Sequence, residues 1–125
     1  MDKEKIKYFA QKILGCGCSE EVFKYIDYET NVKIGNIILK SKINIGNKLL
    51  IYIVEIISPE DLKQILPFLI EEGKKERNLK FNRFRLVLTT KDINEIKQMA
   101  DVLYGKIDKD DKVYLHIIPI EDIPV

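Results

Sequence analysis

The chain has 125 residues, of which 46% are apolar and 33% charged, and its net charge is +1. This balance is typical of one water-soluble globular domain spanning residues 1–125, and it excludes a disordered chain. No apolar run reaches the roughly 20 residues of a membrane helix and the charged N-terminus lacks a signal-peptide core, so the sequence predicts a cytoplasmic protein.

The N-terminal segment predicts two short helices that are joined by an elbow containing both cysteines. Apolar residues recur at helical spacing over residues 2–14, and a glycine follows where helices commonly end. Ser19 is a good N-cap with acidic residues after it, so a second helix is predicted over residues 20–26. The positive end of that helix would favour the thiolate form of the cysteine beside it.

Two strands are predicted next, and they form a β-hairpin. Residues 32–40 and 48–57 are rich in β-branched side chains, and turn-forming residues separate them. Two isoleucines between these segments extend one strand if the turn lies at Gly46 and Asn47. The second strand is almost wholly apolar, which indicates a central strand covered on both faces.

The remaining half alternates helices with strands. A strong helix start at Ser58 opens a helix that Gly73 is expected to end. A third strand is predicted over residues 84–89, and a further helix is expected to end at Gly105. The fourth strand covers residues 113–118, and a proline closes it.

This order predicts a single α/β domain with a four-stranded mixed sheet. A hairpin is followed by two right-handed βαβ units, and two N-terminal helices precede them. The last three strands should therefore run parallel, with the first strand added antiparallel at an edge. The order of strands within the sheet stays open.

Cys16 and Cys18 are the strongest candidates for chemistry. They could cycle between a dithiol and a disulfide, supply two ligands of a zinc or iron–sulfur site, or provide a nucleophilic thiolate. The alternative is a pair of reduced cysteines that pack as small apolar groups in a tight turn. We expect at least one sulfur to be accessible to solvent, with Cys18 the more reactive because it lies nearer the helix start.

A metal site in one chain runs short of ligands. Cys16 and Cys18 are the proposed metal ligands, and His116, the only histidine, is expected to be a half-buried strand residue instead of a third one. A homodimer would complete a four-thiolate site, since each chain would supply one cysteine pair. No catalytic residue is assigned.

Two further segments are candidates for binding sites. Ser58, Thr89, Thr90 and Glu121 are predicted at the ends of parallel strands, where helix starts can hold an anion. Helix capping already explains the serine and threonines at these positions, so the sequence favours that role over anion binding. Residues 74–85 mix basic and aromatic side chains, as single-stranded nucleic-acid sites do, but interspersed acids favour a solvated helix end.

Glu55 is the single acid within the most apolar strand. It is either a buried carboxylate with a raised pKa, or a residue that points to an exposed patch or pairs with a neighbouring lysine.

The leading functional hypothesis is a small cytoplasmic thiol protein whose cysteine pair binds zinc or an iron–sulfur cluster, or undergoes reversible oxidation. The alternative is a non-catalytic interaction or assembly module with structural cysteines. No complete set of hydrolytic residues is present, which favours a protein without enzymatic activity. A homodimer or another protein is the expected partner, and neither nucleic acid nor a membrane is.

Overall fold

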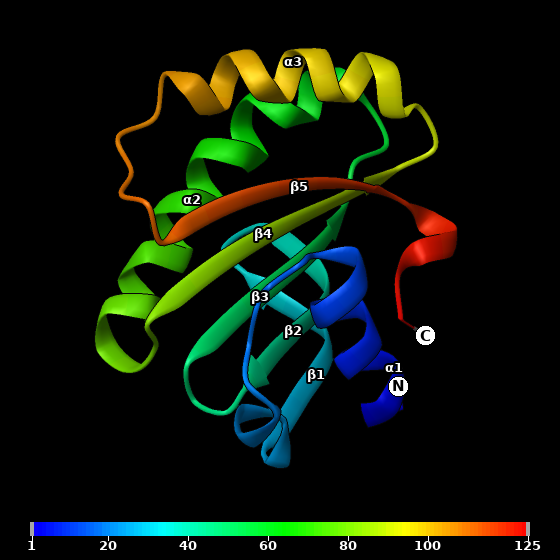
Figure 1. Cartoon of the computed structure of the whole chain (residues 1–125). Coiled ribbons are helices and arrows are strands. Elements are labelled where there is room, and N and C mark those ends of the chain that lie inside the picture. The colour runs from blue at the N-terminus through cyan, green and yellow to red at the C-terminus, as the bar shows by residue number, and fades with distance from the viewer. Residues whose placement is uncertain (1, 125) are drawn as a thin grey trace.

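The computed structural model describes residues 2–124 and contains one five-stranded mixed sheet with helices on both faces (Figure 1). The strands are β1 (Ile26–Ile34), β2 (Ile37–Ile45), β3 (Leu49–Glu55), β4 (Arg83–Thr90) and β5 (Val113–Pro119). They lie in the sheet in chain order. The first three strands pair antiparallel, whereas β3, β4 and β5 pair parallel, which confirms the predicted direction of the last three strands.

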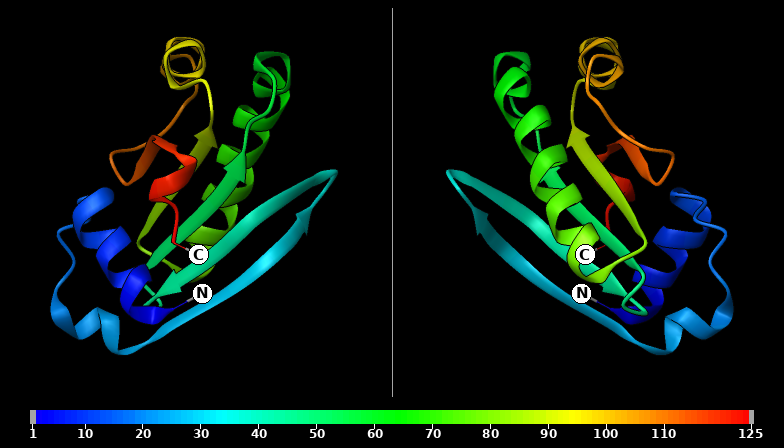
Figure 2. Two further views of the ribbon diagram at one scale, coloured as in Figure 1. Left: turned by 90° about the vertical axis from the view of Figure 1, so that its right-hand side faces the viewer. Right: turned by 90° about the vertical axis from the view of Figure 1, so that its left-hand side faces the viewer.

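The helices divide between the two faces of the sheet. The elements are α1 (Lys3–Tyr8), the π-helical turn η1 (Phe9–Ile13), the 3-10 turn η2 (Glu20–Lys24), α2 (Pro59–Lys80), α3 (Ile93–Gly105) and the 3-10 turn η3 (Ile120–Asp122). Helices α2 and α3 lie on one face, while α1 and η1 lie on the opposite face (Figure 2). We call these the α2/α3 face and the N-terminal face.

The prediction of four strands was wrong, because the first predicted strand spans a turn. Gly35 has a φ of +60° and turns the chain between β1 and β2, in the middle of the predicted strand 32–40. Strand β2 then continues to the turn at Gly46 and Asn47, where φ is +64° and +56°. The turn at Gly46 and Asn47 was the second of the two positions that the sequence allowed, the one in which the two isoleucines extend a strand.

Strand β1 was missed because it is a polar edge strand. It begins at Ile26, where the second helix was expected to end, and most of its side chains are exposed or half-buried. An edge strand has a neighbour on one side alone, so it needs few apolar residues, and charged side chains on it discourage unwanted pairing. Together with β2 it extends beyond the body of the domain (Figure 2).

Contrary to the prediction, helix α2 does not end at Gly73 but continues to Lys80, into the segment that mixes basic and aromatic side chains. Gly73 is buried within the helix, and a Cβ added there would lie 2.1 Å from Cζ of Phe84 on β4. The missing side chain therefore allows the helix to approach the sheet closely, a role that glycine can take inside a helix as well as at its end.

Strand β3 is central, as predicted, and two apolar cores meet on its opposite faces. The core on the α2/α3 face contains Tyr52 and Phe84, whose rings pack edge to face at 4.9 Å. The core on the N-terminal face joins β2, β3 and β4 to α1 and η1, and it includes Cys16. Glu55 lies at the end of β3 and is exposed, so it is not a buried carboxylate.

Candidate functional site

The two cysteines lie in the elbow between η1 and η2, as the sequence predicts. Gly15 and Gly17 both adopt the left-handed conformation, with φ of +63° and +64°. This conformation favours glycine, and it leaves ordinary backbone angles to the cysteines between and after them. The sulfur atoms of Cys16 and Cys18 lie at disulfide distance, and the two Cα atoms are 5.3 Å apart.

The cysteines differ in burial. Cys16 is 4% exposed and packs in the core of the N-terminal face, whereas Cys18 is half-buried at its edge. The backbone N–H of Cys16 donates to the carbonyl of Ala10 at 3.0 Å, which ties the elbow to η1. The backbone N–H of Cys18 donates to Sγ of Cys16 at 3.2 Å. A hydrogen bond of this kind stabilises negative charge on the inner sulfur.

The helix after the elbow is weaker than predicted. It is the short 3-10 turn η2, and Ser19 makes no side-chain capping bond at its start. Its first residue, Glu20, instead forms an ion pair with Lys7 at 2.5 Å and accepts a hydrogen bond from Gln11. A single 3-10 turn has little dipole, so a helix terminus is not the source of positive potential at the elbow.

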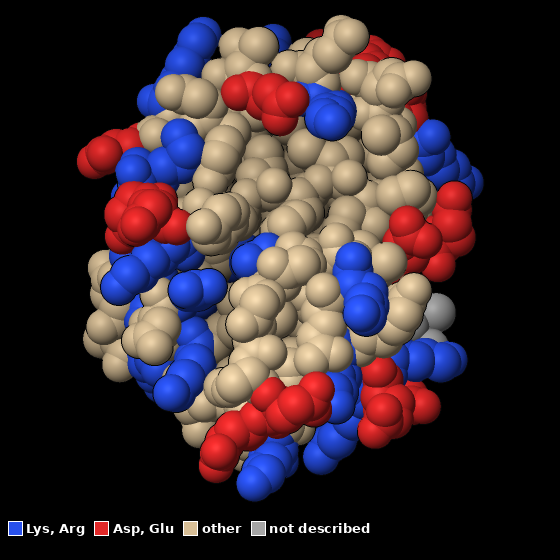
Figure 3. Space-filling view, in the orientation of Figure 1, with Lys and Arg blue, Asp and Glu red and all other residues tan. Residues whose placement is uncertain are grey.

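Two cationic side chains line a hollow beside the elbow instead. The elbow borders a hollow of about 200 Å³, which is lined by Cys16, Gly17, Cys18, Val22, Ile45, Lys48, Leu49, Asn82 and Arg83. Lys48 comes from the turn before β3, and Arg83 begins β4. On the face seen in Figure 3, lysine and arginine side chains gather over the end of α2 and the start of β4. Cations near a cysteine favour the thiolate.

A buried arginine connects the elbow to the sheet. Arg85 is 5% exposed, and its Nη1 donates to the carbonyl of Leu14 at 2.7 Å, two residues before Cys16. The same nitrogen lies 2.9 Å from Nε2 of His116, and the ring of Tyr114 covers the guanidinium at 4.7 Å. Among residues 2–124 no ion pair joins Arg85 to an acid, and its Nε has no hydrogen-bond partner.

His116 is half-buried on β5, as predicted. Burial, with a smaller contribution from the charge of Arg85, lowers its pKa to about 4. The ring is therefore neutral near pH 7, so Nε2 can accept the hydrogen bond from Arg85. His116 therefore contacts the arginine that binds the backbone just before the elbow.

The described part of the chain contains no group of three or more histidine, cysteine or acidic side chains that could hold a metal ion. Cys16 and Cys18 are two soft ligands, and a tetrahedral zinc site needs four donors. A metal site on this pair would therefore need further ligands from a second molecule.

The prediction that Ser58, Thr89 and Thr90 cap helices is confirmed for Ser58 but not for the threonines, because the N-cap of α3 is Asp92. Oγ of Ser58 accepts from the N–H of Glu60 at 3.3 Å, and Oγ1 of Thr90 accepts from the N–H of Asp92 at 3.2 Å. Thr89 is fully buried, and its hydroxyl has no partner.

The basic segment is a solvated helix end only in part: its residues up to Lys80 belong to α2 and form several ion pairs, whereas residues 83–85 begin β4 and Arg85 is buried. Lys74 and Lys75 each pair with the glutamate three residues earlier. Arg77 is buried and binds Asp110 at 2.7 Å.

A polar cluster formed by Lys42 on β2, Tyr52 on β3 and Glu76 on α2 was not predicted. The hydroxyl of Tyr52, which is 1% exposed, donates to Glu76 at 2.5 Å, and the other carboxylate oxygen of Glu76 pairs with Lys42. Burial, followed by the hydrogen bond to Glu76, raises the pKa of Tyr52. Lys42 and Tyr52 are register partners on β2 and β3, which only the strand pairing reveals.

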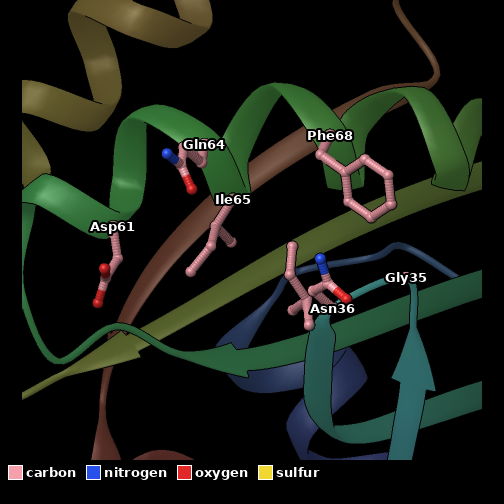
Figure 4. A pocket seen from close by; sticks show the side chains of 7 residues that line it. Gly35, Asn36, Asp61, Gln64, Ile65 and Phe68 are labelled. Carbon is pink, nitrogen blue, oxygen red and sulfur yellow. The ribbon is translucent and has the colours of Figure 1, made fainter.

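A hollow of about 480 Å³ lies between the tip of the β1–β2 hairpin and the first half of α2 (Figure 4). It is lined by Gly35, Asn36, Ile37, Asp61, Gln64, Ile65 and Phe68. Ile65 and Phe68 extend from α2 toward the hairpin. This lining holds one charged side chain and no nucleophile, so it suits contact with an apolar group better than chemistry.

Comparison with known proteins identifies no relative. No family model matches the chain, and neither does any curated protein or solved structure. Across residues 2–124, no helix has both the length and the apolar character needed to span a membrane. The functional argument therefore depends on the elbow and its surroundings.

Proposed function

We propose that the protein exchanges electrons with thiols and disulfides through Cys16 and Cys18. The observation that carries this proposal is the arrangement of the pair: two adjacent sulfur atoms, one in the core and one at its edge, beside a hollow lined by two cations. Close thiols of unequal exposure in a cationic setting are what dithiol–disulfide chemistry requires.

The exchange begins at the half-buried sulfur. A thiolate of a partner dithiol attacks Sγ of Cys18, and the bond between the two cysteines breaks. Its electron pair passes to Sγ of Cys16, where the N–H of Cys18 stabilises the negative charge. The second thiolate of the partner then attacks its own sulfur in the mixed disulfide, which closes the partner's disulfide and releases the Cys18 thiolate.

Two electrons therefore move from the partner to the cysteine pair, and the two new thiolates take up the protons that the partner's thiols lost. The reverse sequence oxidises the pair at the expense of a partner disulfide. Which direction dominates depends on the reduction potentials of the two couples.

Trapping experiments test the assignment of roles. In Cys16→Ser the inner thiol is absent, so Cys18 should form a mixed disulfide with an added small disulfide and retain it. In Cys18→Ser the remaining thiol is buried, and we expect its reaction to be at least tenfold slower, an order of magnitude that follows from access. Mass spectrometry of the native protein counts the adducts.

The proposal fails if neither thiol of the reduced native protein reacts until the protein is unfolded. It also fails if protein purified without oxygen holds a metal ion that both cysteine variants lose, because that result assigns the pair to metal binding. Metal analysis beside the thiol titration separates the two outcomes.

An interaction module with structural cysteines is the second candidate function. The hollow at the hairpin tip supports it, together with Ile38, which lies on the same hairpin and is 62% exposed. A pull-down that recovers the same partner with wild-type protein and with the double cysteine variant, but not after Phe68→Asp, would favour it.

A further inference from the structure

We propose that the small thiol or disulfide that reacts with the elbow carries a negatively charged carboxylate close to its sulfur. This inference depends on the proposed thiol exchange and names the class of its substrate. It arises from the charges that surround the hollow beside Cys18 and from the way the fold holds them in place.

The lining of the hollow contains two cations and no acid. Lys48 and Arg83 are both exposed, and neither forms an ion pair with any of residues 2–124. Asn82, the remaining polar side chain of the lining, is neutral. An anion in this hollow would therefore meet positive charge that the protein itself does not neutralise.

The nearest acids in the sequence are already paired elsewhere. Glu20 is held by Lys7 and Gln11, and Glu21 lies 3.9 Å from Lys24. Neither glutamate lines the hollow. The cations thus remain available to a ligand, although the elbow is followed directly by two acidic residues.

The backbone holds the two cations at one side of the hollow. The carbonyl of Lys48 accepts the N–H groups of both Asn82 and Arg83, at 2.9 and 3.0 Å. Arg83 is also the register partner of Leu49, the residue after Lys48. The turn before β3 and the start of β4 are therefore joined, so the backbone positions from which the two cationic side chains extend are adjacent before a ligand binds.

The volume limits the size of the group that enters. A hollow of about 200 Å³ is smaller than the sites that enclose a whole drug-sized molecule. It suits the reactive end of a substrate, a thiol with one or two carboxylates near it, while the rest stays in solvent. The exchange follows the balanced steps given above, with two molecules of the small thiol acting as the partner dithiol.

Three disulfides that differ in charge provide the test. The reduced native protein is mixed with dithiodipropionate, which is anionic and carries a carboxylate close to each sulfur, with 2-hydroxyethyl disulfide, which is neutral, or with cystamine, which is cationic. Each rate is divided by the rate for the same protein unfolded in urea, which removes the intrinsic reactivity of the reagent. One charge contact at about 4 Å in water is worth about a fivefold change, so we expect at least a fivefold preference for the anion over the cation.

The preference should shrink in about 0.5 M salt, because salt screens exposed charges. It should fall close to one in the double variant Lys48→Gln/Arg83→Gln. The matched control is Lys33→Gln/Lys91→Gln, which removes two exposed lysines outside the hollow and should keep the preference.

The outcomes separate this inference from the proposed function. If the native protein exchanges with none of the three disulfides, the thiol function itself is wrong. If it exchanges with all three without a charge preference, the thiol function stands and the anionic substrate is refuted. If the preference survives loss of Lys48 and Arg83, the thiol function stands and the argument from this hollow is refuted.

Discussion

Replacing Gly73 by alanine tests the close contact between α2 and β4. The Cβ of an alanine would lie 2.1 and 2.2 Å from two ring carbons of Phe84, whereas carbon atoms in contact normally stay about 3.5–4.0 Å apart. The ring cannot simply move away, because Phe84 is 0% exposed and packs edge to face against Tyr52.

Two opposing effects decide the sign of the change. Alanine favours a helix over glycine by about 1 kcal/mol, which would stabilise α2. Overpacking a filled core costs about 1–3 kcal/mol, and an overlap of more than 1 Å with a fixed ring belongs at or above the upper end of that range. We therefore expect Gly73→Ala to lower the free energy of unfolding by about 2 kcal/mol.

Urea unfolding followed by circular dichroism measures this loss, and thermal unfolding should show a melting temperature lower by about 6–10 °C. The matched control is Gly105→Ala at the end of α3, where an added Cβ meets nothing within 4 Å. Helix propensity acts there without a clash, so stability should stay constant or rise slightly.

A Gly73→Ala protein as stable as the wild type would refute the close-packing argument. A second measurement guards against a general effect of the substitution: adding Phe84→Leu to Gly73→Ala should recover part of the loss, since the smaller side chain makes room. The two substitutions should therefore be strongly non-additive, which a double-mutant cycle detects.

Three further predictions concern polar groups. Tyr52→Phe removes the hydrogen bond to Glu76, so urea unfolding should show a loss of about 1 kcal/mol; an unchanged midpoint would contradict this. The pKa of His116 is lowered to about 4 from 6.5, mainly by burial. As the pH falls, the unfolded chain therefore binds a proton at His116 before the folded protein does. This difference contributes about 1–2 kcal/mol to the free energy of unfolding, a figure reduced for partial exposure. The contribution is present above pH 6.5 and is lost as the pH falls toward 4. His116→Gln should flatten this part of the stability–pH curve, and an unchanged slope would refute it. The hydrogen bond from Arg77 lowers the pKa of Asp110. Asp110→Asn should therefore cost about 1 kcal/mol or less near pH 7 and nothing once the acid is protonated, which unfolding at pH 7 and pH 2 compares.

Local signals in the chain were enough to predict the parallel half of the fold. The cap at Ser58, the helical spacing of apolar residues after it and the apolar run of β3 each depend on neighbours within a few positions. Parallel strands that alternate with helices follow from these signals, because a helical crossover is the usual connection between them. The elbow at Cys16 and Cys18 was predictable for the same reason.

Tertiary contacts decided the rest. Strand β1 has few apolar residues because it lies at an edge, and position 73 is a glycine inside a helix because Phe84 fills the space beside it. Neither fact has a local signal.

The surroundings of the cysteines depend on the fold even more strongly. Arg85 reaches the carbonyl of Leu14 across 71 positions of the chain, and Arg83 lines the hollow beside Cys18 because the elbow packs over the start of β4. Spacing along the chain shows which thiols are close to each other. It does not show which charges face them, because those charges come from segments that meet only when the sheet has formed.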